Sequence, residues 1–324
     1  MSGLRLLPRL AAASFAFALS AHSYAYCLTY TCDPSRDCAN SATACDPNKY
    51  CTTDSETGCR VGGKPLFWAS SVVSFDVQRD GSKLADISYD QLLTVVSNAF
   101  QRWVDAACDD SHGPSIKLKD FGPVECAKPE YNKSQPNQNV ITFHDSEWPY
   151  MNTGAETLAL TTVFFNPDSG EIYDANIELN SNQATFVLGP GQGDAGAVDL
   201  NAVLTHEIGH FLGLSHSSNG SATMYSQYKV GMTTLEDDDI AAICASLPPD
   251  RTTADPGNPV GVPRHGFSTQ CGEPETGCCA STIGGKAPSS GPLALWAFGL
   301  GLIAWCGRSK RLARAKRSER ALPR

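Results

Sequence analysis

The chain has little positive charge over most of its length. It carries 25 Lys and Arg against 34 Asp and Glu, a formal net charge of −9. Eight Lys or Arg and one Glu lie between 308 and 324, and Arg5 and Arg9 lie near the start, so residues 26–307 carry −18. So acidic a body argues against nucleic acid as a partner and favours a soluble, exported protein.

The sequence also lacks an apolar run of the ~20 residues that usually cross a membrane. A shorter run at 10–19 follows two arginines and precedes a small-x-small site, which predicts a secretory signal peptide over residues 1–25. Another, at 292–307, is interrupted by glycine and followed by the basic block. We interpret 292–324 as an anchoring tail with a cytoplasmic basic end, and a buried helix is the alternative for each run.

Cysteine is plentiful, with 13 residues, and in an exported chain this number indicates disulfides. Six lie between Cys27 and Cys59, in a stretch with few large apolar side chains. We therefore predict a disulfide-stapled segment over 26–65. Six cysteines allow fifteen pairings, and the sequence does not choose among them. The segment fits a binding module, a shield over an active site or an ordered leader equally well.

One domain is expected over residues 66–247, long enough for a sizeable core. Apolar and alternating patterns predict strands over 71–77, 116–118, 140–143, 158–165 and 172–179, the last strand of the domain. Helical periodicity predicts helices over 89–107 and 234–246, the second with Thr234 and Asp237 as a capping box. Residues 248–291 are rich in Pro, Gly, Ser and Thr, which indicates a linker.

Histidine is scarce, with 7 residues in the chain, yet three of the seven lie in one short stretch. On a helix capped by Asp199, His206 and His210 are i and i+4, so both rings leave the same face. Gly213 follows where helices often end in a left-handed turn, which can bring His216 back as a third ligand. Three scattered histidines without a shared role are the alternative.

Three nitrogen ligands suit Zn²⁺ and leave the fourth position open for water, as in catalytic rather than structural sites. Bound zinc lowers the pKa of that water towards ~7. Glu207 lies on the same helix face and can accept the proton without being a ligand. The remaining face carries an apolar stripe for the core, formed by Leu204, Ile208, Phe211 and Leu212.

The pattern H-E-x-x-H-x-x-G-x-x-H resembles the metzincin signature. Ser217 directly after the third His, and Ala222-Thr223-Met224-Tyr225 eight residues beyond it, are similar to the matrixin branch. This resemblance implies an α+β fold in which a twisted mixed sheet packs on helices. It also implies that Met224 forms a structural Met-turn under the metal and that Tyr228 lines the wall of a specificity pocket.

The same resemblance implies peptide-bond hydrolysis of a protein or peptide substrate by a monomer. Substrate would lie extended along an edge strand, for which 160–165 is the candidate. Two readings compete with this one. A catalytically degenerate surface protein would bind through its Cys-rich segment, and a zinc hydrolase would act on a non-peptide bond.

The chain departs from the matrixin pattern in three places. The second, structural zinc of matrix metalloproteases would need histidines where this chain has Thr162 and Asn176, so one zinc is expected. Matrixin zymogens block the zinc with a cysteine, and the segment around Cys59 is only distantly similar to that pattern. We assign Cys59 to a disulfide. The Pro expected two residues after the Met-turn methionine is Ser226, which implies a pocket of altered shape.

Asp174 and Glu178 are oxygen donors spaced i and i+4, hence on one face of a strand. We interpret them as ordinary polar strand residues, with a Ca²⁺ site as the alternative. If a second zinc exists, His144 and Asp145 are the residues to consider. At the C-terminus, a Cys-containing patch, an apolar stretch and a basic end resemble the sorting tails of myxobacterial surface proteins, which implies export and surface attachment.

Overall fold

The computed structural model describes residues 25–33, 46, 49–109, 112–150, 157–193, 195–251, 258–272 and 280–283. Residues 1–24 of the predicted signal peptide and the whole tail at 292–324 lie outside these ranges. So do Cys38 and Cys45 and the cysteine patch of the tail. The interpretations that depend on them stay predictions.

A mixed seven-stranded sheet forms the centre of the described chain. In spatial order its strands are β13 (Ala280–Ile283), β8 (Ala159–Phe165), β9 (Glu171–Leu179), β7 (Val140–Phe143), β5 (Val72–Gln78) and β6 (Lys117–Val124), while β4 (Phe67–Trp68) also pairs with β9. The pairs β5–β6, β5–β7, β7–β9 and β4–β9 are parallel, whereas β8–β9 and β13–β8 are antiparallel. The expected strand at 140–143 is confirmed. The other main strands agree within one residue at each end, except β6, which runs six residues further than expected.

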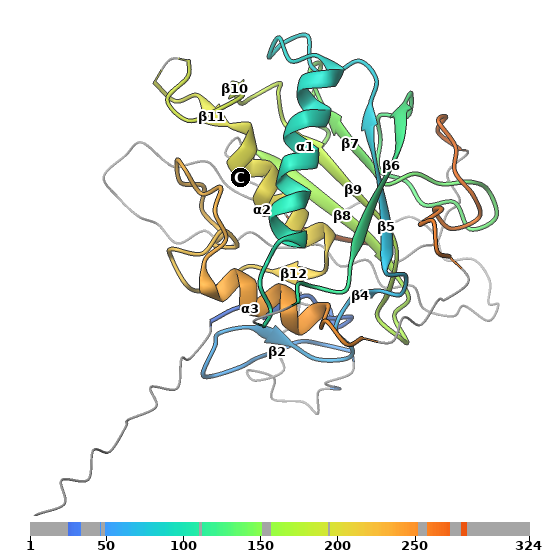
Figure 1. Ribbon diagram of the computed structural model, residues 1–324, viewed down its shortest axis with the longest axis vertical. Coiled ribbons are helices and arrows are strands. Elements are labelled where there is room, and N and C mark those ends of the chain that lie inside the picture. Colours follow the sequence, from blue (N-terminus) through green and yellow to red (C-terminus); the bar gives the residue numbers. More distant parts are fainter. Residues whose placement is uncertain are drawn as a thin grey trace, which may run out of the picture.

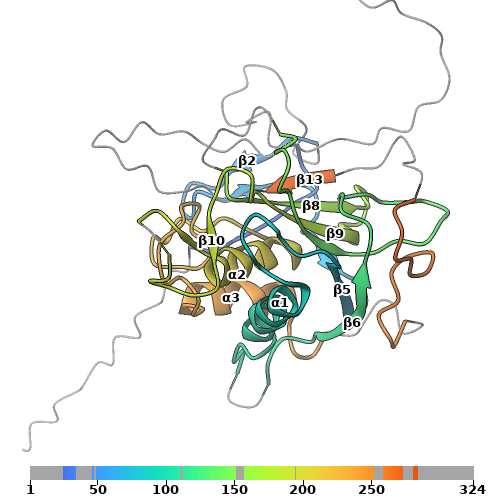
Figure 2. The ribbon, with the colours of Figure 1, turned by 90° about the horizontal axis from the view of Figure 1, so that it is seen from above.

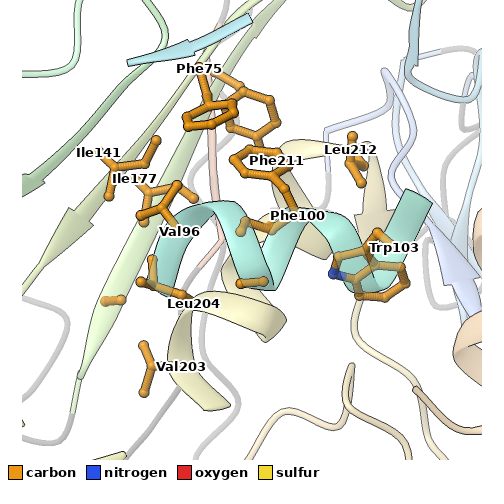
Figure 3. Packing of buried hydrophobic residues seen from close by; sticks show 14 of the residues in the cluster. Phe75, Val96, Phe100, Trp103, Ile141, Ile177, Val203, Leu204, Phe211 and Leu212 are labelled. Carbon is orange, nitrogen blue, oxygen red and sulfur yellow. The ribbon is translucent and has the colours of Figure 1, made fainter. Parts of the chain in front are cut away.

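Helices α1 (Tyr89–Val104) and α2 (Leu200–Phe211) cover one face of this sheet (Figures 1 and 2). α1 begins with a full capping box. The Ser88 side chain accepts a hydrogen bond from the Gln91 backbone N–H, and the Gln91 side chain accepts one from the Ser88 backbone N–H. Between the helices and the sheet, Phe100 stacks on Phe75 at 4.8 Å and meets Phe211 edge-on at 5.1 Å (Figure 3). This core fixes α2 relative to the strands, and it confirms the α+β class.

Short strands complete the domain after β9, which is therefore not the last strand as predicted. They are β10 (Phe186–Val187), β11 (Val198–Asp199) and β12 (Leu214–Ser215), followed by β13. The predicted C-terminal helix is α3 (Asp237–Ser246), and its proposed capping box is wrong. The cap is Glu236 with Asp239, because Asp239 is held in place by backbone groups far from it in sequence, as described below.

The Cys-rich segment packs beside the helical part of the domain. β1 (Cys27–Leu28) pairs antiparallel with β12, and a small hairpin joins β2 (Thr52–Thr53) to β3 (Arg60–Val61). Two disulfides join its described residues, Cys27–Cys59 and Cys32–Cys51. Cys59 is therefore disulfide-bonded, as expected, and cannot be the free thiol of a matrixin-type latency switch.

Parts of the predicted linker pack on the domain. The disulfide Cys126–Cys271 ties 258–272 to the end of β6, and the Thr269 carbonyl accepts from Glu125 N at 2.7 Å. β13 then adds a strand to the sheet beside β8. A further disulfide, Cys108–Cys244, links the end of α1 to α3. None of the helices in the described part of the chain combines the length and apolar character that a membrane crossing needs.

The sheet face opposite the helices is unusually polar, and Asp76 on β5 is fully buried there. Burial raises the pKa of Asp76 from 3.8 to about 8. The unfolded chain releases this proton near pH 4, whereas the folded chain keeps it to about pH 8. The free energy of unfolding therefore decreases as pH rises through that window.

We expect Asp76→Asn to raise the melting temperature at pH 8 and to leave it almost unchanged at pH 4. At about 1.36 kcal/mol per pKa unit, the gain has an upper limit of about 5 kcal/mol. Thermal melts between pH 4 and pH 8 measure it, with the exposed Asp168 replaced by Asn as the matched control. An offset between Asp76→Asn and the unaltered chain that stays constant with pH would contradict this account.

Candidate functional site

Helix α2 is rigidly held along its buried side. The Asp199 side chain caps its first turn by accepting from Asn201 N at 3.0 Å, as the sequence predicts. Two indole N–H groups bind its backbone at 2.8 Å: Trp103 donates to the Thr205 carbonyl and Trp68 to the Phe211 carbonyl. The predicted apolar stripe is buried in full, with Leu204, Ile208, Phe211 and Leu212 all at 0 % exposure.

The chain reverses directly after this helix. Gly213 has a φ of +97°, in the left-handed region that the sequence pattern predicts at this position. A Cβ there would also press on the carbonyl of Leu66. The turn leads into β12, which pairs with β1 and places His216 back beside the helix.

The three predicted histidines meet at one point. The distance from His210 Nε2 is 3.1 Å to His206 Nε2 and 3.2 Å to His216 Nε2. The other ring nitrogens of the helix pair face carbonyl oxygens: His206 Nδ1 lies 2.7 Å from Thr223 O, and His210 Nδ1 lies 2.9 Å from Leu214 O. These carbonyls accept from Nδ1–H, so the lone pairs of both helix histidines are on Nε2, directed to the shared centre.

Burial keeps these rings neutral at ordinary pH. It lowers the pKa of His206 to about 4 and that of His216 to about 3. The pKa of His210, which is fully buried, is also lowered, first by burial and then by its two histidine neighbours. A neutral imidazole is the form that binds a metal.

The donor set fits zinc. Three tetrahedral ligands at Zn–N distances of ~2.0–2.1 Å would place their nitrogens about 3.3–3.4 Å apart. The observed separations of 3.1 and 3.2 Å are within a few tenths of an ångström of that value. Three lone pairs turned towards one another are otherwise mutually repulsive, and a cation between them removes that conflict.

Glu207 lies next to this centre and is fully buried. Its Oε2 accepts a hydrogen bond of 2.6 Å from the hydroxyl of Thr161 on β8. The carboxylate is thus fixed between the zinc helix and the sheet strand that flanks it. Glu207 lies outside the group of residues whose ligand atoms converge, which is formed by the three histidines alone.

Met224, the residue that the resemblance assigns to a Met-turn, packs against the helix that carries His206 and His210. It is buried, and its thioether packs so closely on the helix that a Cβ at Gly209 would overlap Met224 and Trp103. Asp239 at the start of α3 holds the turn in place, because its carboxylate accepts from Met224 N at 2.9 Å and from Thr223 N at 2.8 Å.

A pocket opens beside His206 and Glu207. It is lined by Leu158, Ala202, Val203, Thr223, Tyr225, Gln227, Tyr228, Lys229 and Met232. Tyr228, the predicted wall residue, is fixed by its hydroxyl, which accepts from Asp199 N at 2.9 Å. Most of these side chains are apolar, so the pocket is suited to an apolar group placed next to the histidine centre.

The residues in place of the second zinc ligands have other partners. Thr162 and Asn176 are direct neighbours across β8 and β9. Asn176 Oδ1 accepts from Val140 N at 2.9 Å, and its amide nitrogen donates to Asp174.

The remaining candidates are also separated. Glu178 accepts from Tyr150 and lies 2.7 Å from His144 Nε2, so its carboxylate is engaged away from Asp174. Asp145 accepts from the hydroxyls of Ser82 and Ser181, both at 2.6 Å. The fully buried Asp174 keeps one carboxylate oxygen without a hydrogen bond, and burial raises its pKa.

Two residues of this site were not predicted to act in it. Thr161 was assigned only to a strand, and Asp239 only to the start of the last helix. No local pattern points to either, because each acts on a group more than ten residues away in sequence. The sequence offered one indication only: Thr161 lies in the strand that was expected to flank the cleft.

Comparison with known proteins agrees with this geometry. The family model of the matrixins matches residues 67–246, more than half of the chain. Karilysin of Tannerella forsythia is 33 % identical over 115 residues, which cover 33 % of this chain and 22 % of karilysin. Matrix metalloproteinase-C of Caenorhabditis elegans is 24 % identical over 206 residues, 60 % of this chain and 31 % of that protein.

A shorter stretch is more similar still. Metalloendoproteinase 1-MMP of Arabidopsis thaliana is 52 % identical over 52 residues, which cover 14 % of each protein. The chain belongs to the matrixin family. The matched stretches span less than a third of each of these three relatives.

Proposed function

We propose that the protein is an exported zinc metalloendopeptidase. The observation that carries this proposal is the convergence of three neutral imidazoles, with His210 Nε2 at 3.1 and 3.2 Å from the Nε2 atoms of the other two, beside a buried glutamate that is not one of them. His206, His210 and His216 would hold one Zn²⁺, which would supply a water of lowered pKa and polarise the substrate carbonyl. Met224 has a structural role below the ligands.

Glu207 performs the proton transfers. As general base it takes the proton of the attacking water, and as general acid it returns a proton to the amine that leaves. Its Oε2 accepts from the hydroxyl of Thr161, which holds the carboxylate beside the three histidines. Its burial excludes bulk water, so the carboxylate acts in a medium of low polarity where charge interactions are strong.

The pocket beside Glu207 selects one substrate side chain. Its wall residue Tyr228 is held by the backbone of Asp199, and Val203 and Met232 give it an apolar lining. We expect one position adjoining the cut bond to favour large apolar residues. Cleavage-site sequencing of a random peptide library measures this preference, and equal use of charged and apolar residues at every position would contradict it.

The same library tests the function itself. The competing functions, a degenerate binding protein and a zinc hydrolase of non-peptide bonds, predict no peptide cleavage. An ester panel run in parallel separates those two. Peptide hydrolysis that is lost with a chelator and restored by added zinc is the expected result.

Export and surface attachment form the cellular part of the proposal. The disulfides of the described chain suit an oxidising compartment. The sequence supplies a signal peptide and an apolar tail with a basic end. We expect truncation after Ser290 to release a surface-associated protein into the medium, as measured by fractionation. Equal amounts in the medium with and without the tail would rule out anchoring.

Asp174 and Glu178 act as polar strand residues in this proposal. Glu178 has two hydrogen-bonding partners of its own, His144 and Tyr150, which disfavours a shared calcium site. Calcium remains the alternative at Asp174, where one oxygen has no partner. A rise in melting temperature with added Ca²⁺ that Asp174→Asn abolishes would favour that alternative.

A further inference from the structure

The strand that flanks the site is already paired on its outer side. β13 runs antiparallel to β8, with Ala280 opposite Phe164 and Ile283 opposite Thr161. Figure 2 shows β13 alongside β8, at the margin of the sheet. Without β13, β8 would be the outermost strand of the sheet, since its other side is taken by β9.

This edge adjoins the reacting centre. Ile283 lies opposite Thr161, the residue whose hydroxyl binds Glu207 at 2.6 Å. A peptide that is cut at the zinc site must pass close to this point. An extended peptide binds a sheet edge through the outward N–H and C=O groups of the edge strand. β8 offers one such set, and β13 uses it over four residues.

The position of β13 is favoured by a short tether. Cys271 is disulfide-bonded to Cys126, and Gly272 N donates to the buried Glu130 carboxylate. Seven residues, 273–279, connect this fixed point to Ala280. A tether of that length gives an effective concentration of about a millimolar, so even weak strand pairing is well populated.

We propose that the outer edge of β8 is the docking surface for the segment Ala280–Ile283 of the same chain, which competes there with extended peptide substrates. The inference rests on the proposed function. It assigns the covering of the substrate edge to a C-terminal segment, while the N-terminal Cys-rich segment packs at β12. Removal or displacement of Ala280–Ile283 would then increase access to the site.

Proline substitutions in the full-length chain test the proposal. Neighbouring residues of a strand direct their N–H groups to opposite sides, so only one of Ser281→Pro and Thr282→Pro removes a donor that faces β8. Each variant thus serves as the control for the other. With an effective concentration near a millimolar, we expect one variant to lower KM about 3- to 10-fold and to leave kcat nearly unchanged. An acetylated peptide of residues 280–287, added in trans, should raise KM again.

The outcomes separate the inference from the function it rests on. Peptide hydrolysis with the same KM in all three chains and no inhibition by the added peptide at millimolar concentration would overturn the inference alone. If no chain hydrolyses peptides, the proposed function fails, and competition for substrate fails with it. Fluorescence anisotropy of the labelled peptide then still decides docking, which requires tighter binding to one proline variant than to the unaltered chain. Thermal melts check that both variants fold.

A second inference depends on a different observation, the 2.6 Å bond from Thr161 to Glu207. We infer that Thr161 is a positioning residue, whose hydroxyl holds Oε2 and thereby fixes the orientation of the Glu207 carboxylate. Thr161 is fully buried, and its hydroxyl also lies 3.2 Å from the Glu207 carbonyl. The bond therefore spans from the sheet to the helix in a place that water does not reach.

Two substitutions at one position test this role. Thr161→Val keeps the shape and removes the hydroxyl, whereas Thr161→Ser keeps the hydroxyl and removes a methyl group. We expect kcat to fall about ten-fold in the first variant with KM unchanged, and the second to retain most of kcat, with zinc bound in both. A purely structural role would lower stability in both and would not separate them. Equal kcat in the two variants would overturn the inference.

Discussion

Replacement of Glu207 with alanine is expected to abolish hydrolysis and to leave zinc bound. In the proposed mechanism the carboxylate moves a proton and coordinates nothing, so its loss removes general acid–base catalysis, an effect of about 10²- to 10⁴-fold on kcat. The three histidine nitrogens that converge at 3.1 and 3.2 Å do not depend on it. Metal analysis and peptide hydrolysis of the same preparation measure both quantities.

The exposed Glu147, replaced by alanine, is the matched control and should behave like the unaltered chain. Loss of zinc together with activity would show that Glu207 supports the metal site rather than the chemistry. Activity retained in Glu207→Ala would require another base and would refute the mechanism. The two failures are distinct, because only the first lowers the zinc content.

The zinc helix was predictable because everything that forms it is local. The i, i+4 spacing of the histidines, the Asp199 cap and Gly213 lie within fifteen residues, and each confers its conformation through near neighbours. The turn at Gly213 and the strand β12 place His216 at the same centre. The distant segment that contributes is β1, which pairs with β12. The spacing of the three histidines along the sequence therefore already predicts most of the candidate site.

What the sequence could not supply depends on contacts between distant segments. The start of α3 is shifted because Asp239 binds the Met-turn backbone at Thr223 and Met224. The pairing of β13 with β8 joins positions more than one hundred residues apart. The segment Ala-Ser-Thr-Ile lies in a stretch rich in glycine and serine and shows no strand pattern of its own. It forms a strand because it pairs with the neighbouring edge of β8.

Disulfide pairing also depends on contacts between segments that are distant in the sequence. The six cysteines of the N-terminal segment allowed fifteen arrangements, and the bonds Cys27–Cys59 and Cys32–Cys51 follow from how the segment lies against β12. Cys126 and Cys271 join two segments that the sequence pattern assigned to the domain and to the linker after it. The stretch from 258 to 272 is therefore part of the packed structure, although its composition is that of a linker.

Replacement of His210 with alanine is expected to reduce bound zinc from one per chain to near zero and to abolish hydrolysis. In the proposed site His210 is the middle ligand, since its Nε2 lies 3.1 and 3.2 Å from the Nε2 atoms of the other two histidines. Its loss leaves only two ligands, one fewer than a catalytic zinc site uses.

Metal analysis after dialysis measures this, with the exposed His112 replaced by alanine as the matched control. A value of two zincs in the unaltered chain would show that a second site exists. If one zinc then survives His210→Ala, it must be held elsewhere, and His144 would be the first ring to examine. The structure argues against that outcome, because His144 Nε2 faces the Glu178 carboxylate at 2.7 Å and Asp145 is held by the hydroxyls of Ser82 and Ser181.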